Sequence, residues 1–171
     1  MKLEEQTEGF KIENLSDNPL FITTFLRVFS IALRTHQEEK LESLRNVVIN
    51  AAKPIYVEDD VSQMFTNFID TFTPWHIKIL ELLDKIDFEI SDFHTSGRLY
   101  SNNVRDYVLN NFPELQRDDA FAAQVIRDLQ DRGMIKSDDD PELIASEDSE
   151  RSTGIPNTTP FGKRFLKIIH S

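Results

Sequence analysis

Apolar residues recur every three or four positions along much of the chain, which is the spacing of one face of an α-helix. In residues 1–72 this spacing predicts three helices, over about residues 19–34, 38–53 and 58–72. Polar residues or a proline separate each helix from the next. Short amphipathic helices with short connections pack antiparallel, so we predict an N-terminal helical subdomain in residues 1–72.

The first of these helices begins with a clear start signal and carries three aromatic rings. Asp17 and Asn18 each offer a capping oxygen, and Pro19 suits the first helical position, where a backbone N–H has no partner. Phe21, Phe25 and Phe29 follow at intervals of four residues. This spacing is typical of a core-facing stripe, yet three short helices cannot bury many of the 13 phenylalanines. We therefore predict that Phe21, Phe25 and Phe29 are candidates for an interaction surface.

From Thr73 the pattern predicts four more helices and, between the last two, a pair of short strands. The helices are expected over about residues 74–86, 102–111, 118–132 and 160–170. Gly133 lies just after the third of them, where a left-handed glycine commonly ends a helix. The strand candidates are residues 134–136 and 157–159, and a strongly acidic loop joins them.

This order of elements resembles that of a winged helix-turn-helix domain with an extra closing helix. The resemblance rests on residues 73–80, 129–135 and 158–165. In the second of these segments the step Leu-x-x-x-Gly is similar to the point where the third helix of such a domain turns into its wing. The chain also resembles a group of uncharacterised bacterial proteins that place such a domain behind N-terminal helices, and that group implies no activity.

The fold class expected is therefore mainly α, with two parts. An N-terminal helical subdomain covers residues 1–72, and a C-terminal winged-helix-like domain with a small β-hairpin wing covers residues 73–171. One fold serves many functions, so the resemblance by itself assigns none.

Charge argues against the function that a winged helix most readily suggests. The chain holds 19 Lys and Arg against 30 Asp and Glu, a formal net charge of -11, whereas DNA affinity rests largely on basic residues that neutralise phosphates. In the resembling families the third helix lies in the major groove. This implies Gln124 and Arg127 as DNA-contact candidates, with Lys163 and Arg164 on the last helix. The acidic wing loop would face the duplex, so we expect nucleic acid to be disfavoured as a partner.

The residue types needed for catalysis or metal binding are sparse. Cysteine is absent, which excludes disulfide scaffolds, Cys-ligated zinc, iron–sulfur clusters and thiol nucleophiles. No two of the four histidines are spaced i, i+4, and the 5 glycines form no phosphate-binding loop. We expect no catalytic residue, no metal and no cofactor, and a hydrolase or metal enzyme is only a third alternative.

The start of the chain is acidic and lacks the basic and apolar parts of a secretory signal, and no apolar run reaches the length of a membrane span. A cytoplasmic location and no membrane partner are therefore expected. The favoured function is a non-enzymatic protein-interaction or self-associating module, whose partner is another protein or a second copy in a homodimer. The alternative is a transcription regulator that binds DNA through a limited patch on the helix at residues 118–132.

Overall fold

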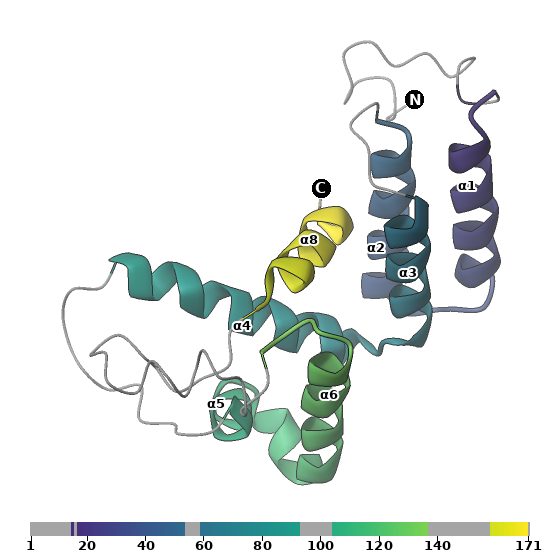
Figure 1. Cartoon of the computed structure of the whole chain (residues 1–171). Helices are drawn as coiled ribbons and strands as arrows, with labels where there is room; N and C mark the ends of the chain where they lie inside the picture. Colours follow the sequence, from purple (N-terminus) through teal and green to yellow (C-terminus); the bar gives the residue numbers. More distant parts are fainter. Residues whose placement is uncertain (1–14, 16, 54–58, 93–103, 137–157, 171) are drawn as a thin grey trace. The chain divides into compact units, whose positions relative to one another are not determined.

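A computed structural model of the chain describes residues 15, 17–53, 59–92, 104–136 and 158–170. Within these residues the protein is mainly α-helical, with seven α-helices and one 3₁₀ helix (Figure 1). The helices are α1 (Pro19–Ala32), α2 (Glu38–Ala51), α3 (Asp59–Thr71), α4 (Pro74–Asp92), α5 (Val104–Asn111), η2 (Pro113–Asp118), α6 (Asp119–Asp131) and α8 (Pro160–Ile169). The mainly α fold expected from the sequence is confirmed. Among the described residues, no helix is both long enough and apolar enough to cross a membrane.

One predicted helix end is wrong. The sequence predicts a break from residue 87, whereas α4 continues to Asp92. Residues 87–92 contain neither proline nor glycine, which are the residues that most strongly interrupt a helix. The helical pattern therefore continues until the chain leaves the described residues.

The chain forms two compact units, and each is described by itself. The first unit comprises Met1–Pro74 and Phe165–Ser171, and the second comprises Trp75–Arg164. Helix α8 contributes its first half to the second unit and its second half to the first. The domain boundary predicted at residue 73 stays a prediction.

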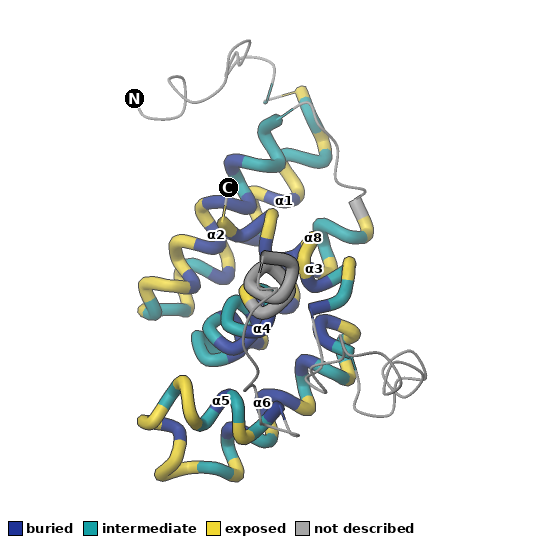
Figure 2. The backbone as a smooth tube through the Cα atoms, turned by 90° about the vertical axis from the view of Figure 1, so that its left-hand side faces the viewer, coloured by how far each residue is buried: buried dark blue, intermediate teal, exposed yellow. Residues whose placement is uncertain are grey.

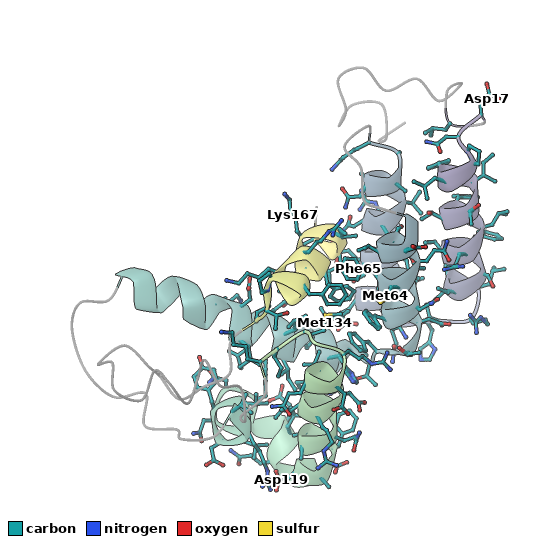
Figure 3. All side chains as sticks on the ribbon, viewed as in Figure 1. Asp17, Met64, Phe65, Asp119, Met134 and Lys167 are labelled. Atoms are coloured by element: carbon teal, nitrogen blue, oxygen red, sulfur yellow. The ribbon has the colours of Figure 1, made fainter. Side chains whose placement is uncertain are left out.

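The first unit is a helical bundle whose core is rich in aromatic rings. Phe65 and Phe72 of α3 and Phe165 of α8 are fully buried, and Figure 3 shows Phe65 pointing from α3 toward α8. The ring of Phe165 meets that of Phe65 edge-on, with centroids 5.3 Å apart, and that of Phe72 at 5.9 Å. Edge-to-face pairs are favoured because the positive edge of one ring meets the negative face of the other. Figure 2 shows buried and exposed positions mixed along α1 and α2, as in amphipathic helices.

Two asparagines of α2 bind the C-terminal end of α8. The Nδ2 atom of Asn46 donates to the carbonyl of Ile169 at 2.7 Å, and that of Asn50 donates to the carbonyl of Ile168 at 2.8 Å. The last carbonyls of a helix have no partner within the helix. These side chains therefore complete the end of α8 with hydrogen bonds from a segment far away in the sequence.

We predict that Asn46→Ala lowers the free energy of unfolding by about 1–3 kcal/mol, because a buried hydrogen bond to the Ile169 carbonyl is lost. Urea unfolding followed by circular dichroism measures the loss. Asn110→Ala is the matched control, since Asn110 is exposed on α5. A loss no larger than that of the control would contradict a stabilising role for Asn46.

The core of the second unit is formed by apolar residues of three helices. They include Leu80 and Leu83 of α4, Val108 of α5, and Val125 and Leu129 of α6. The side chain of Asp118 caps α6 by accepting the Phe121 N–H at 3.1 Å. Each of these helices thus contributes fully buried apolar residues, and α5 and α6 contact one another.

Gly133 ends α6 as the sequence predicts. Its φ is 67°, in the left-handed region that glycine adopts without strain. The Met134 N–H then donates to the carbonyl of Leu129 at 2.9 Å, and the Gly133 N–H to that of Gln130 at 2.8 Å. These two bonds satisfy carbonyls that the helix leaves open, and they turn the chain sharply after α6.

The chain returns to this turn at Thr158. Ile135 and Thr158 form an isolated antiparallel bridge, and the Thr159 N–H donates to the Met134 carbonyl at 2.9 Å. The Thr159 hydroxyl accepts the Gly162 N–H at 3.0 Å, which caps the first turn of α8. The predicted strands are represented by this single bridge among the described residues, and the predicted wing loop lies in residues 137–157, outside them.

Candidate protein-interaction surface on helix α1

Helix α1 carries apolar residues on two opposite sides. On one side Thr24, Val28 and Ile31 are buried, and α1 contacts α2 and α3. The other side carries four large apolar residues, and Leu33, the residue that follows α1, continues it. We call these five residues the outer face of α1: Ile22, Phe25, Leu26, Phe29 and Leu33. Successive residues turn by roughly 100° around a helix, which places the centre of the outer face roughly opposite the buried side.

The outer face is strongly exposed. The exposed fraction of its residues runs from 40% at Ile22 to 72% at Leu33, with Leu26 at 59%. A residue that packs into a bundle core is instead almost fully removed from water, as Val28 and Ile31 are. The outer face is therefore not part of the core of the first unit.

The predicted interface phenylalanines form one row along α1. The rings of Phe21 and Phe25 stack with centroids 6.1 Å apart, and those of Phe25 and Phe29 stack at the same distance. Phe25 and Phe29 are exposed by 44% and 53%, whereas Phe21 is half-buried. The structure thus brings all three together and leaves the second and third open to water.

Local capping fixes where this row begins. The side chain of Asn18 accepts the N–H groups of Leu20 at 3.1 Å and Phe21 at 3.2 Å, and Pro19 occupies the first turn. These are the residues that a helix start prefers. The helix is thereby set to begin one residue before Leu20, which fixes the side on which each later ring lies.

The outer face is free of charge. The only charged residue of α1 is Arg27, and its guanidinium donates to the Gln63 side chain of α3 at 3.2 Å. The outer face is therefore an uncharged surface on a chain whose formal net charge is -11.

Asp70, near the end of α3, binds one residue that follows α1 and one residue at the start of α2. Its carboxylate pairs with the guanidinium of Arg34 at 3.1 Å, and its backbone carbonyl accepts a hydrogen bond from Nζ of Lys40 at 2.8 Å. Lys40 is only 8% exposed, and burial lowers the pKa of its ammonium group. The Asp70 carboxylate opposes this lowering of the pKa, and Arg34 adds to it.

We predict that the ammonium group of Lys40 makes the free energy of unfolding rise with pH. Its pKa is lower in the folded protein than in the unfolded chain, so between those two pKa values the unfolded chain holds a proton that the folded protein has released. The free energy of unfolding should therefore rise relative to that of Lys40→Met as the pH rises toward about 10.5, the ordinary pKa of lysine. Urea unfolding of both proteins at a series of pH values below about 10.5 measures this rise in the free energy of unfolding. If the difference in the free energy of unfolding between the native chain and Lys40→Met stays constant or falls with pH, the prediction is contradicted.

The DNA-contact candidates on α6 lie beside carboxylates. The amide of Gln124 donates to Asp128 at 2.7 Å, and the other oxygen of Asp128 lies 3.4 Å from Nε2 of His76. Arg127 is exposed. The amide that was a candidate for reading bases is thus already bound to an acidic side chain of the same helix.

The remaining charges near α6 do not form a basic surface. Asp118 and Asp131 are exposed, and Asp119 pairs with Arg105 of α5. Lys163 and Arg164 are exposed on α8. Acidic groups are therefore interspersed where a groove-binding helix would have to approach phosphates.

The described residues offer no constellation typical of a metal centre. They contain no group of three or more His, Asp or Glu that could hold a metal ion. His36 and His170 are exposed, His76 is buried, and His94 lies outside the described residues. The expected lack of catalytic residues and cofactors stays a prediction.

The outer face contains three residues that sequence reasoning missed as interface candidates. They are Ile22, Leu26 and Leu33. With Phe29 they are spaced by four, three and four residues, which is the seam spacing of paired helices. That spacing is the sequence signal for these three residues.

No protein-family model, no curated protein and no solved structure matches this chain.

Proposed function

We propose that this chain is a non-enzymatic protein-interaction module that binds through the outer face of α1. The observation that carries the proposal is the exposure of five large uncharged apolar residues on one side of one helix. A large apolar side chain has roughly 200 Å² of surface, so the exposed area is on the order of 500 Å². This is the size of the largest apolar patch on a typical monomer, and such a patch is often functional.

The second unit is best explained as a winged-helix-like domain that serves as a structural part of this module. Three observations support it: the order of α4, α5 and α6, the left-handed turn at Gly133, and the bridge between Ile135 and Thr158. In this proposal Ile135 and Thr158 belong to the two strands of the β-hairpin wing. The cytoplasmic location expected from the sequence stays a prediction.

Thiol labelling in living cells tests the proposed function. The chain has no cysteine, so one introduced cysteine reports on one position. We expect Leu26→Cys to react with a thiol probe several-fold more slowly than Glu42→Cys in the native host, because a bound protein covers the outer face. Glu42 is exposed on α2 and serves as the matched position. Both variants should react equally fast once denatured, and equal rates in cells would overturn the proposal.

The alternative function, a transcription regulator, is disfavoured by the charges around α6. Its contacts would come from Gln124, Arg127, Lys163 and Arg164, whereas the Gln124 amide is bound to Asp128. A duplex titration at low salt separates the two functions. Binding that weakens steeply with added salt would favour the regulator, and no detectable binding would favour the interaction module.

A further inference from the structure

We infer that the outer face of α1 binds the same face of a second copy of this chain, as an antiparallel, two-fold symmetric pair of helices. This inference rests on the proposed function and names its partner. Three independent features of α1 support it: the spacing of the apolar residues, the distribution of charge and the area exposed.

The spacing of the outer face is self-complementary. Ile22, Leu26, Phe29 and Leu33 follow at intervals of four, three and four, which reads the same in both directions. In an antiparallel pair Ile22 then lies opposite Leu33 of the second copy, and Leu26 lies opposite Phe29 of the second copy. Alternating intervals of three and four form the apolar seam between paired helices. A two-fold interface requires one patch to complement itself. The symmetric spacing of the outer face meets this requirement.

Charge favours a copy of the outer face over a charged partner. Two copies that each carry a net charge of -11 repel one another. Helix α1 itself adds no negative charge to this repulsion, because Arg27 is its only charged residue and donates to Gln63. A basic partner would instead be drawn to carboxylates, which the outer face lacks. An uncharged apolar seam fits an equally uncharged seam.

The exposed area matches that of a weak dimer. Two outer faces of on the order of 500 Å² each would bury on the order of 1,000 Å² together. Specific interfaces begin near this total area. The pair should therefore be specific but weak, with a dissociation constant on the order of micromolar.

Sedimentation equilibrium of the full chain between about 1 and about 100 µM tests the inference. We expect a monomer–dimer equilibrium for the native sequence and a monomer for Leu26→Glu, since a buried carboxylate on each copy opposes pairing. Leu41→Glu is the matched control and should dimerise as the native chain does, because Leu41 is an exposed leucine, at 37%, on α2 and outside the outer face. A monomeric native chain, or a Leu26→Glu variant that still dimerises, overturns the inference.

Disulfide trapping tests the antiparallel register without a charged substitution. Equal amounts of Ile22→Cys and Leu33→Cys chains are mixed and oxidised. An antiparallel pair predicts mainly the mixed disulfide, because identical positions lie roughly 16 Å apart along the helix axis, too far for a disulfide. A parallel pair gives mainly the two homodisulfides, and unrelated encounters give all three statistically. Either result overturns the antiparallel pair.

The two proposals fail in different ways. If Leu26→Cys is protected in cells while the purified chain stays monomeric and unprotected, the interaction module stands and its partner is a different protein. If the purified monomer is itself protected at Leu26, another segment of the same chain covers the outer face, and the inference of a second copy is wrong. If Leu26→Cys reacts freely in cells, both proposals fail.

Discussion

Replacing Phe165 with alanine is expected to destabilise the protein by about 3–5 kcal/mol. Phe165 is fully buried, and its ring meets those of Phe65, Phe68 and Phe72 at centroid distances of 5.3, 6.3 and 5.9 Å. The substitution removes three edge-on ring contacts and leaves a cavity. The cavity cannot collapse easily, because the three surrounding rings are held on one helix, α3.

Urea unfolding followed by far-ultraviolet circular dichroism measures this loss. Phe29→Ala is the matched control, since it makes the same chemical change at a residue that is 53% exposed. We expect the control to cost no more than about 1 kcal/mol. Equal losses for the two variants would mean that Phe29 is buried as deeply as Phe165, and would contradict the outer face of α1 as an exposed surface.

Replacing Gly162 with alanine is the second change expected to have a large effect, with a loss of about 3 kcal/mol or more. A Cβ at this position would lie 2.2 Å from the backbone oxygen of Met134 and 2.8 Å from Cγ2 of Thr158. The Met134 oxygen cannot readily move, because it accepts hydrogen bonds from the N–H of Thr159 at 2.9 Å and from its hydroxyl at 3.2 Å. The close packing of α8 on the turn after α6 therefore requires glycine.

Gly133→Ala is the matched control for this second change. Gly133 also lies in the second unit, yet a Cβ there would meet no atom within 4 Å. Only the strain of its φ of +67° remains, which costs about 1–2 kcal/mol. Differential scanning calorimetry of both variants measures the difference. A Gly162→Ala variant as stable as Gly133→Ala would show that the two segments separate at little cost.

The starts of α1 and α6 can be predicted from the sequence because the residues that cause them lie beside them. The Asn18 side chain at α1 and the Asp118 side chain at α6 accept N–H groups within three residues, and Pro19 is the first residue of α1, so each cause lies beside the helix start. Gly133 is local in the same way. By contrast, Asn46 bonds to Ile169, 123 residues away, and no local pattern predicts such a contact.

The candidate surface could be predicted only in part. The abundance of phenylalanine correctly indicated that Phe25 and Phe29 need not be buried, and both are exposed. Helical spacing, however, does not show which of two apolar sides packs against α2 and α3. The buried side carries Thr24, Val28 and Ile31. Tertiary packing thus decided the side on which Ile22, Leu26 and Leu33 lie.

Photo-crosslinking in the living host tests most directly the central claim, that the outer face of α1 is a protein-binding surface. A photoreactive amino acid is placed at Leu26 and, as a control, at Glu42. We predict a crosslinked product from Leu26 alone, and mass spectrometry should find only peptides of this chain in it if the partner is a second copy. A chain that gives no more crosslinked product from Leu26 than from Glu42 would contradict the claim.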